Sequence, residues 1–228
     1  LHARGGSRVL VGHGASIESL TVHGDLLLSG DAAGIALVWD LPSGRVLRRV
    51  TGGGGRLVAL GLGGDGRSLM TAARTTGGAG GVQALVRQFD LLARAELERV
   101  RLPAGLEPVP GGVASTGRWV ALQGADGLHV WEVGGARVPL RLPGSAGEAS
   151  ARGSAFLPVR GERVRLVQVD AAGQLRQWEL GWSSGSPSAE PLAAVALPAG
   201  AAPHWLRLAQ WPGGPVGAGG WLICGDES

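Results

Sequence analysis

The residues that could do chemistry in this chain are few and far apart. Its five histidines are dispersed, and none lies at a metal-ligand spacing from the single cysteine, Cys224, or from a carboxylate. Cys224 ends an apolar run, which favours a small core residue over a nucleophile. Glu96 and Glu98 lie beside alternating arginines, as on the solvent face of a strand, rather than as an acid–base pair. We therefore predict no catalytic residue, no metal site, no cofactor and no enzymatic activity.

Two glycine-rich runs, 52–55 and 77–81, resemble in composition the loops that cradle phosphate groups. Neither is followed by the Gly-Lys-Ser/Thr sequence of a P-loop, and the chain contains no lysine. Neither run opens a clear helix, as a dinucleotide-binding fingerprint must. We interpret both runs as flexible loops between strands.

Arginine and tryptophan offer the best candidates for contact with partners. All 21 basic residues are arginine, and the net charge is only +3. One tryptophan falls in a segment predicted to be a loop, 181–190, where it suits either an interface anchor or a side chain folded under its own loop. The arginine clusters suit a solvated surface, or contact with an acidic protein surface or an RNA backbone. The candidate partner contacts are Arg48, Arg49, Arg160, Arg163, Arg165 and Trp182.

The lone cysteine excludes an internal disulfide bond, and no N-terminal signal pattern is visible. The longest weakly polar stretch, 191–208, is interrupted by prolines and a histidine, so we predict no membrane span. These features favour an intracellular, cytoplasmic protein. A nuclear location, or one in a cytoskeletal or ciliary assembly, stays open.

The elements that carry these residues recur as a repeat. An aromatic–acidic pair ends an apolar, alternating run four times, at 39–40, 89–90, 131–132 and 178–179, with spacings of 50, 42 and 47 residues. Tight turns rich in Asp, Ala and Gly, such as Asp31 to Gly34, lie between the apolar runs. Between residues 12 and 50, three short apolar runs end in Trp-Asp, and a fourth follows a Pro-Ser-Gly turn. This pattern predicts sheets of four short strands.

The segment from Gly12-His13 to Trp39-Asp40 resembles the WD40 repeat family, whose propeller blades carry Gly-His near the start and Trp-Asp at the end of the third strand. The resemblance implies an all-β, WD40-type β-propeller with about five blades, part of a seven-bladed ring in a longer chain. The expected blades are 12–51, 52–102, 103–143, 144–200 and an incomplete 201–228, and residues 1–11 supply the last strand of a preceding blade. One alternative stays open, because the apolar residues of 82–102 also fit a helical stripe.

Blades of the WD40 family often contain a hydrogen-bonded tetrad of His, Ser or Thr, Asp and Trp. His13, Ser29 and Trp39 stand at matching positions, whereas the expected Asp position, six residues before the tryptophan, holds Ala33. The resemblance therefore implies an incomplete tetrad in the first blade. Because the tetrad is a structural device, no functional residue is implied by it.

The resemblance implies a non-enzymatic scaffold that binds other proteins of an intracellular complex through loops on a rigid ring. An alternative rests on the tail, 203–212 and 220–226, which resembles a late blade of the WD40 partner of a tRNA ribose methyltransferase. It implies an accessory subunit that acts with RNA.

Overall fold

The computed structural model describes residues 8–51, 54–63, 65–76, 81–114, 118–135, 138–143, 153–158, 163–169, 174–183, 186–196, 205–209 and 221–225. Within these ranges every regular element is a strand. The strands of the first two sheets are β1 (Ile17–His23), β2 (Leu26–Asp31), β3 (Ala36–Asp40), β4 (Arg45–Val50), β5 (Arg56–Leu62), β6 (Ser68–Thr76), β7 (Val82–Asp90) and β8 (Ala95–Arg101).

The remaining strands form two further sheets and a two-stranded ladder. They are β9 (Glu107–Val113), β10 (Trp119–Gly124), β11 (Gly127–Glu132), β12 (Leu140–Arg141), β13 (Gly153–Pro158), β14 (Val164–Val169), β15 (Gln174–Ser183), β16 (Ser186–Pro191), β17 (Val195–Ala196), β18 (Trp205–Ala209) and β19 (Trp221–Gly225). The all-β prediction is therefore confirmed.

Each sheet is an antiparallel meander in which neighbours in sequence are neighbours in space. The strand orders are β1-β2-β3-β4, β5-β6-β7-β8, β9-β10-β11-β12 and β13-β14-β15-β16, and β17 also pairs with β15. β18 pairs with β19 alone. This connectivity follows from the short connections of two to seven residues between successive strands of the four larger sheets, because parallel strands need a crossover of about a dozen residues or more.

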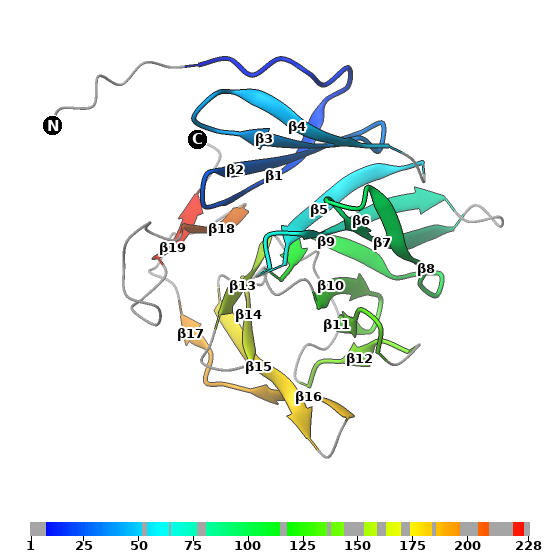
Figure 1. Cartoon of the computed structure of the whole chain (residues 1–228). Coiled ribbons are helices and arrows are strands. Elements are labelled where there is room, and N and C mark those ends of the chain that lie inside the picture. Colours follow the sequence, from blue (N-terminus) through cyan, green and yellow to red (C-terminus); the bar gives the residue numbers. More distant parts are fainter. Residues whose placement is uncertain are drawn as a thin grey trace, which may run out of the picture.

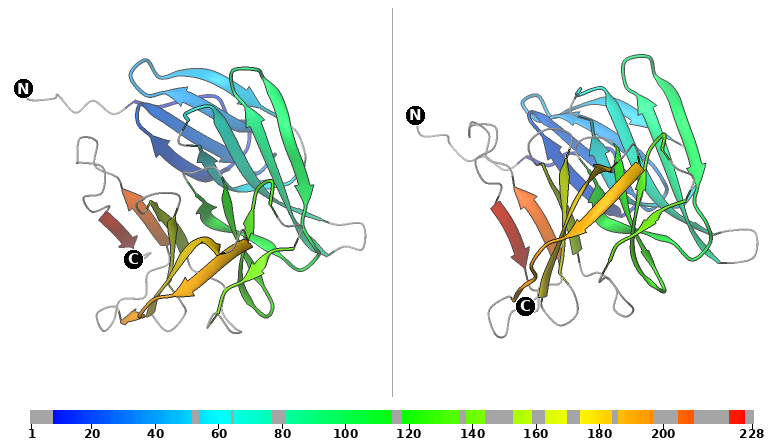
Figure 2. Two further views of the ribbon diagram at one scale, coloured as in Figure 1. Left: turned by 60° about the horizontal axis from the view of Figure 1, so that its bottom comes forward. Right: turned by 90° about the horizontal axis from the view of Figure 1, so that it is seen from below.

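The sheets stand side by side around a common centre, as Figures 1 and 2 show. The first strand of each sheet lies innermost, and contacts run in succession through β1, β5, β9, β13 and β18. The outer strands β4, β8, β12 and β16 lie at the rim (Figure 1). This radial packing is that of propeller blades.

The hydrophobic core consists of layers between neighbouring sheets. Along β6, Leu69 and Ala73 pack against the first sheet, whereas Met70 and Ala72 face the third. Successive side chains of a strand point to opposite faces, so a sheet between two others is apolar on both sides. This explains why its strands lack a strict polar–apolar alternation.

Close approach of backbones sets the spacing between the sheets at two glycines. A Cβ atom at Gly30 would lie 2.7 Å from Ser19 Oγ and 2.8 Å from Leu57 Cβ. A Cβ atom at Gly61 in β5 would overlap the side chain of Val113 in β9. The Ser19 hydroxyl also donates a hydrogen bond to the Leu57 carbonyl at 2.7 Å, which links the first strands of two sheets.

The structure resolves the alternatives that the sequence left open. Residues 82–102 form the strands β7 and β8, not a helix, because β7 pairs along its length with β6. The strand predicted within residues 1–11 is not formed by the described residues 8–11, which are irregular, and residues 1–7 lie outside the described ranges. The prediction that Trp182 lies in a loop is wrong, because this residue belongs to β15 and pairs with Pro187 of β16.

Candidate interaction surface

A buried hydrogen-bonded chain joins four side chains of the first sheet. His13 Nδ1 lies 2.8 Å from Asp31 Oδ2, and His13 Nε2 lies 2.6 Å from Ser29 Oγ. The indole Nε1 of Trp39 donates to the same Ser29 oxygen at 2.7 Å. A carboxylate can only accept, so Nδ1 of a neutral His13 donates to Asp31. Nε2 then accepts from the serine hydroxyl, and every polar atom of the chain is satisfied.

The prediction that this tetrad lacks its acid is wrong. The acid is Asp31, eight residues before Trp39, rather than Ala33 at the expected sixth position. The second oxygen of Asp31 accepts the backbone N–H groups of Ala33 and Ile35, which holds the β2–β3 turn. Burial opposes ionisation of Asp31, but the N–H of Ile35 and the ring of His13 outweigh it and lower the pKa of this carboxyl. The tetrad has no polar atom left for a ligand, and its role is structural.

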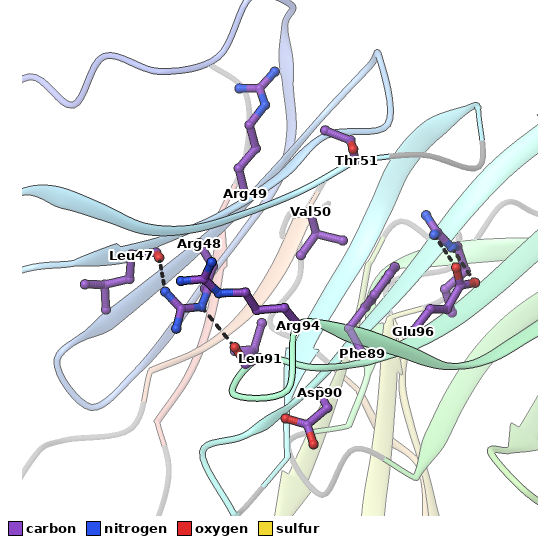
Figure 3. Close-up of a pocket in the computed structure, with 11 residues that line it drawn as sticks. Leu47, Arg48, Arg49, Val50, Thr51, Phe89, Asp90, Leu91, Arg94 and Glu96 are labelled. Atoms are coloured by element: carbon purple, nitrogen blue, oxygen red, sulfur yellow. Dashed lines mark hydrogen bonds and ion pairs between the residues drawn. The ribbon is translucent and has the colours of Figure 1, made fainter.

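A groove of about 500 Å³ lies at the rim between the first two sheets (Figure 3). Its residues come from β4, from β7, and from the turn and strand that follow β7. They are Leu47, Arg48, Arg49, Val50, Thr51, Arg87, Phe89, Asp90, Leu91, Arg94 and Glu96. Arg48 and Arg49 are among the contacts predicted from the sequence. The groove itself was not predicted, because the two segments that form its walls are about 40 residues apart in the chain.

The acidic side chains of this rim groove are already neutralised. Asp90 accepts from Arg67 Nε at 2.8 Å, and this contact, with backbone N–H groups of the following turn, lowers the pKa of Asp90 to about 2. Glu96 is paired with Arg87 and Arg99, which lower its pKa to about 2. Both carboxylates therefore stay ionised and bound to arginine at neutral pH.

Three arginines of the rim groove, Arg48, Arg49 and Arg94, have no acidic partner among the described residues. Arg48 donates from Nε to the carbonyl of Leu91 at 2.9 Å and from Nη1 to the carbonyl of Leu47 at 2.8 Å. Arg94 is exposed and has a positive φ of 55°, a left-handed conformation that is costly for a residue with a Cβ. Arg49 contributes less, because its side chain points away from Arg94 and Phe89 in Figure 3.

Comparisons with known proteins agree with the fold. No protein-family model and no curated protein matches the sequence. Among solved structures, the β-propeller domain of Myceliophteria thermophila Cps50 (Swd1) matches 86% of this chain with a TM-score of 0.55 and 18% identity. The RRP9 WD40 repeats match 80% of it with a TM-score of 0.50 and 19% identity.

The chain folds as a WD40-type β-propeller. It spans 60% of the Cps50 chain and 53% of the RRP9 chain. Within this propeller the aromatic–acidic pairs mark the third strand of each four-stranded blade, at the ends of β3, β7, β11 and near the middle of β15. The first blade carries Gly-His at residues 12–13, and the later blades have no matching Gly-His.

Three of the remaining predicted contacts, Arg163, Arg165 and Trp182, lie in or next to β14 and β15 of the fourth blade. Arg163 pairs with Glu179 at 2.7 Å, and Arg165 approaches the same carboxylate at 3.7 Å, so this cluster is partly neutralised by its own sheet. Arg160 lies outside the described residues. Trp182 lies near the tip of the β15–β16 hairpin. Among these candidates, Arg48 and Arg49 are therefore the described arginines that line a groove and have no acidic partner among the described residues.

The described part of the propeller holds no group of three or more His, Cys, Asp or Glu side chains placed to bind a metal ion. None of the described residues belongs to a helix long and apolar enough to cross a membrane.

Proposed function

We propose that this propeller is a non-enzymatic scaffold that binds other proteins of an intracellular complex. The observation that carries the proposal is the rim groove, where Arg48 and Arg94 line a concave surface without acidic partners from the described chain. Layers of buried side chains hold the blades rigidly on either side of it. A rigid ring with cationic, loop-bearing edges positions partners without changing its own fold.

Trp182 is the second proposed contact. It lies near the tip of a hairpin at the rim of the fourth blade, where main-chain pairing with β16 fixes its backbone. Aromatic residues on rigid hairpins are favoured as interface anchors, since they bury a large area at low entropic cost. We expect Trp182→Ala to weaken capture of partners while leaving the melting temperature unchanged. Leu97→Ala, which truncates an exposed apolar side chain on β8, is the matched control.

The scaffold proposal is tested by affinity purification of the full-length protein from its native cells, followed by mass spectrometry with and without RNase. A fixed set of partner proteins that survives RNase is the expected result. A protein that purifies without partners would contradict a scaffold role. Loss of the whole set on RNase treatment would instead favour the RNA-associated alternative. Of the tail that suggested this alternative, the structure describes the strands β18 and β19.

A further inference from the structure

We propose that the rim groove between β4 and the β7–β8 turn binds an extended, acidic segment of a partner protein, with its carboxylates on Arg48 and Arg94. This inference rests on the proposed scaffold function and adds to that function a binding site and a class of partner.

The backbone holds Arg48 in place while leaving its guanidinium able to bind an anion. Two of its nitrogen atoms donate to the carbonyls of Leu91 and Leu47, so the side chain crosses from the first blade to the second (Figure 3). A guanidinium has five N–H donors in a planar fork, and these two bonds leave others for a carboxylate. The side chain is thus positioned before a partner arrives, which lowers the entropic cost of binding.

Arg94 adds a second cation to the same groove. It follows the Asp90 turn, whose carboxylate accepts the N–H groups of Leu92 and Ala93 and so fixes the turn conformation. Glycine or asparagine normally occupies a left-handed position of this kind, so an arginine there carries a conformational cost. Two cations beside one groove repel each other, and a bridging anion relieves that repulsion.

Four of the residues that line the groove are apolar, which indicates what accompanies the acidic groups of the partner segment. Phe89 and Leu91 are buried, Val50 is half-buried, and Leu47 is 45% exposed beside them. A segment that places an apolar side chain on this surface and carboxylates on the two arginines would use both parts of the groove. Acidic segments with interspersed apolar residues have this chemistry.

The same geometry disfavours a nucleic acid. Single strands bind where bases can stack on open aromatic faces, but the guanidinium of Arg87 lies 4.4 Å from the ring centroid of Phe89 and occupies that face. The affinity of a nucleic acid grows with the number of phosphates neutralised, and the groove offers three arginines without an acidic partner among the described residues.

The test begins with selection of binders from a random peptide library displayed on phage, using the full-length protein. We expect the selected sequences to be enriched in Asp and Glu with interspersed apolar residues. Synthetic copies of the best binder are then titrated by fluorescence anisotropy against wild type, Arg48→Gln and Arg94→Asn. Each variant is expected to weaken peptide binding about tenfold or more, because it removes a charge-assisted hydrogen bond to a carboxylate of the peptide. Asparagine tolerates the left-handed backbone at 94, so the fold is kept.

The control is Arg45→Gln. Arg45 is an exposed cation on β4, the strand that carries Arg48, but it does not line the groove, so this variant should bind the peptide with the affinity of wild type. Selected peptides no more acidic than the library, or unaffected by the variants at 48 and 94, would overturn the proposal. The proposal would also be overturned if polyuridylate RNA binds wild type and this binding is lost in the variants at 48 and 94. If native partners co-purify equally with Arg48→Gln, the groove assignment fails while the scaffold stands; if no partner co-purifies with wild type, the scaffold fails first.

Discussion

Replacing Ser29 by alanine should destabilise the first blade far more than the loss of one hydroxyl on the surface would. The Ser29 oxygen is the shared partner of Trp39 Nε1 at 2.7 Å and His13 Nε2 at 2.6 Å. Trp39 is 3% exposed and the His13 side chain 6% exposed, so water cannot replace the missing hydroxyl freely. Each buried polar group left without a partner costs about 1–3 kcal/mol.

Two such groups, with the histidine near the edge of the buried region, give an expected loss of about 3 kcal/mol in the free energy of unfolding. For a chain of this length that loss lowers the melting temperature by about 6–12 °C. The assay is thermal unfolding of Ser29→Ala followed by circular dichroism. Ser16→Ala, which removes an exposed hydroxyl at the start of the same blade, is the matched control, with an effect within about 0.5 kcal/mol.

A double-mutant cycle identifies the cause. Trp39→Phe removes the indole N–H, so in the double variant with Ser29→Ala that donor is no longer left buried without a partner. The double variant should therefore lose about 1–2 kcal/mol less than the sum of the two single variants. A Ser29→Ala variant as stable as Ser16→Ala, or two single effects that simply add, would refute the tetrad argument.

Two further predictions concern packing and charge. Gly61→Ala should lower the free energy of unfolding by about 1–3 kcal/mol, because the added Cβ would overlap Val113 of the neighbouring blade. Gly14→Ala, which has open space around it, should have the melting temperature of wild type, and equal melting temperatures for the two variants would contradict the close approach at Gly61. Glu96→Gln tests the ion pair with Arg87: the pKa of Glu96 falls from 4.5 to about 2 on folding, so its stabilisation is complete above pH 4.5 and is lost as pH falls towards 2. Melting temperatures measured across that range should converge for wild type and Glu96→Gln, and a constant difference would argue against the pair.

Local features allowed much of the fold to be predicted from the sequence. Short apolar runs and the Asp and Gly residues of the turns act over a few residues, so β2, β3 and their connecting turn follow from residues 26–40 alone. The aromatic–acidic pairs then recur because every blade repeats the same local unit. For this reason the four-stranded sheets were predictable before any long-range contact was known.

The sites depend on contacts that no local pattern encodes. Asp31 was missed as the tetrad acid because its distance from His13 depends on how the loop before β1 folds back over the blade. Trp182 was assigned to a loop because its segment is rich in Ser and Gly, yet pairing with β16 extends the strand through it.

The sequence by itself determined the strands, the turns and the repeat, since these depend on neighbours a few residues away. Only the tertiary structure decided which arginines are free to bind. Arg163 and Arg165 meet Glu179 across a strand pair, whereas Arg48 reaches the backbone of the next blade and meets no carboxylate among the described residues. The physical reason is that a charge is neutralised by whatever packs within a few ångströms of it, and that neighbour comes from a paired strand or from the next blade rather than from adjacent positions in the sequence.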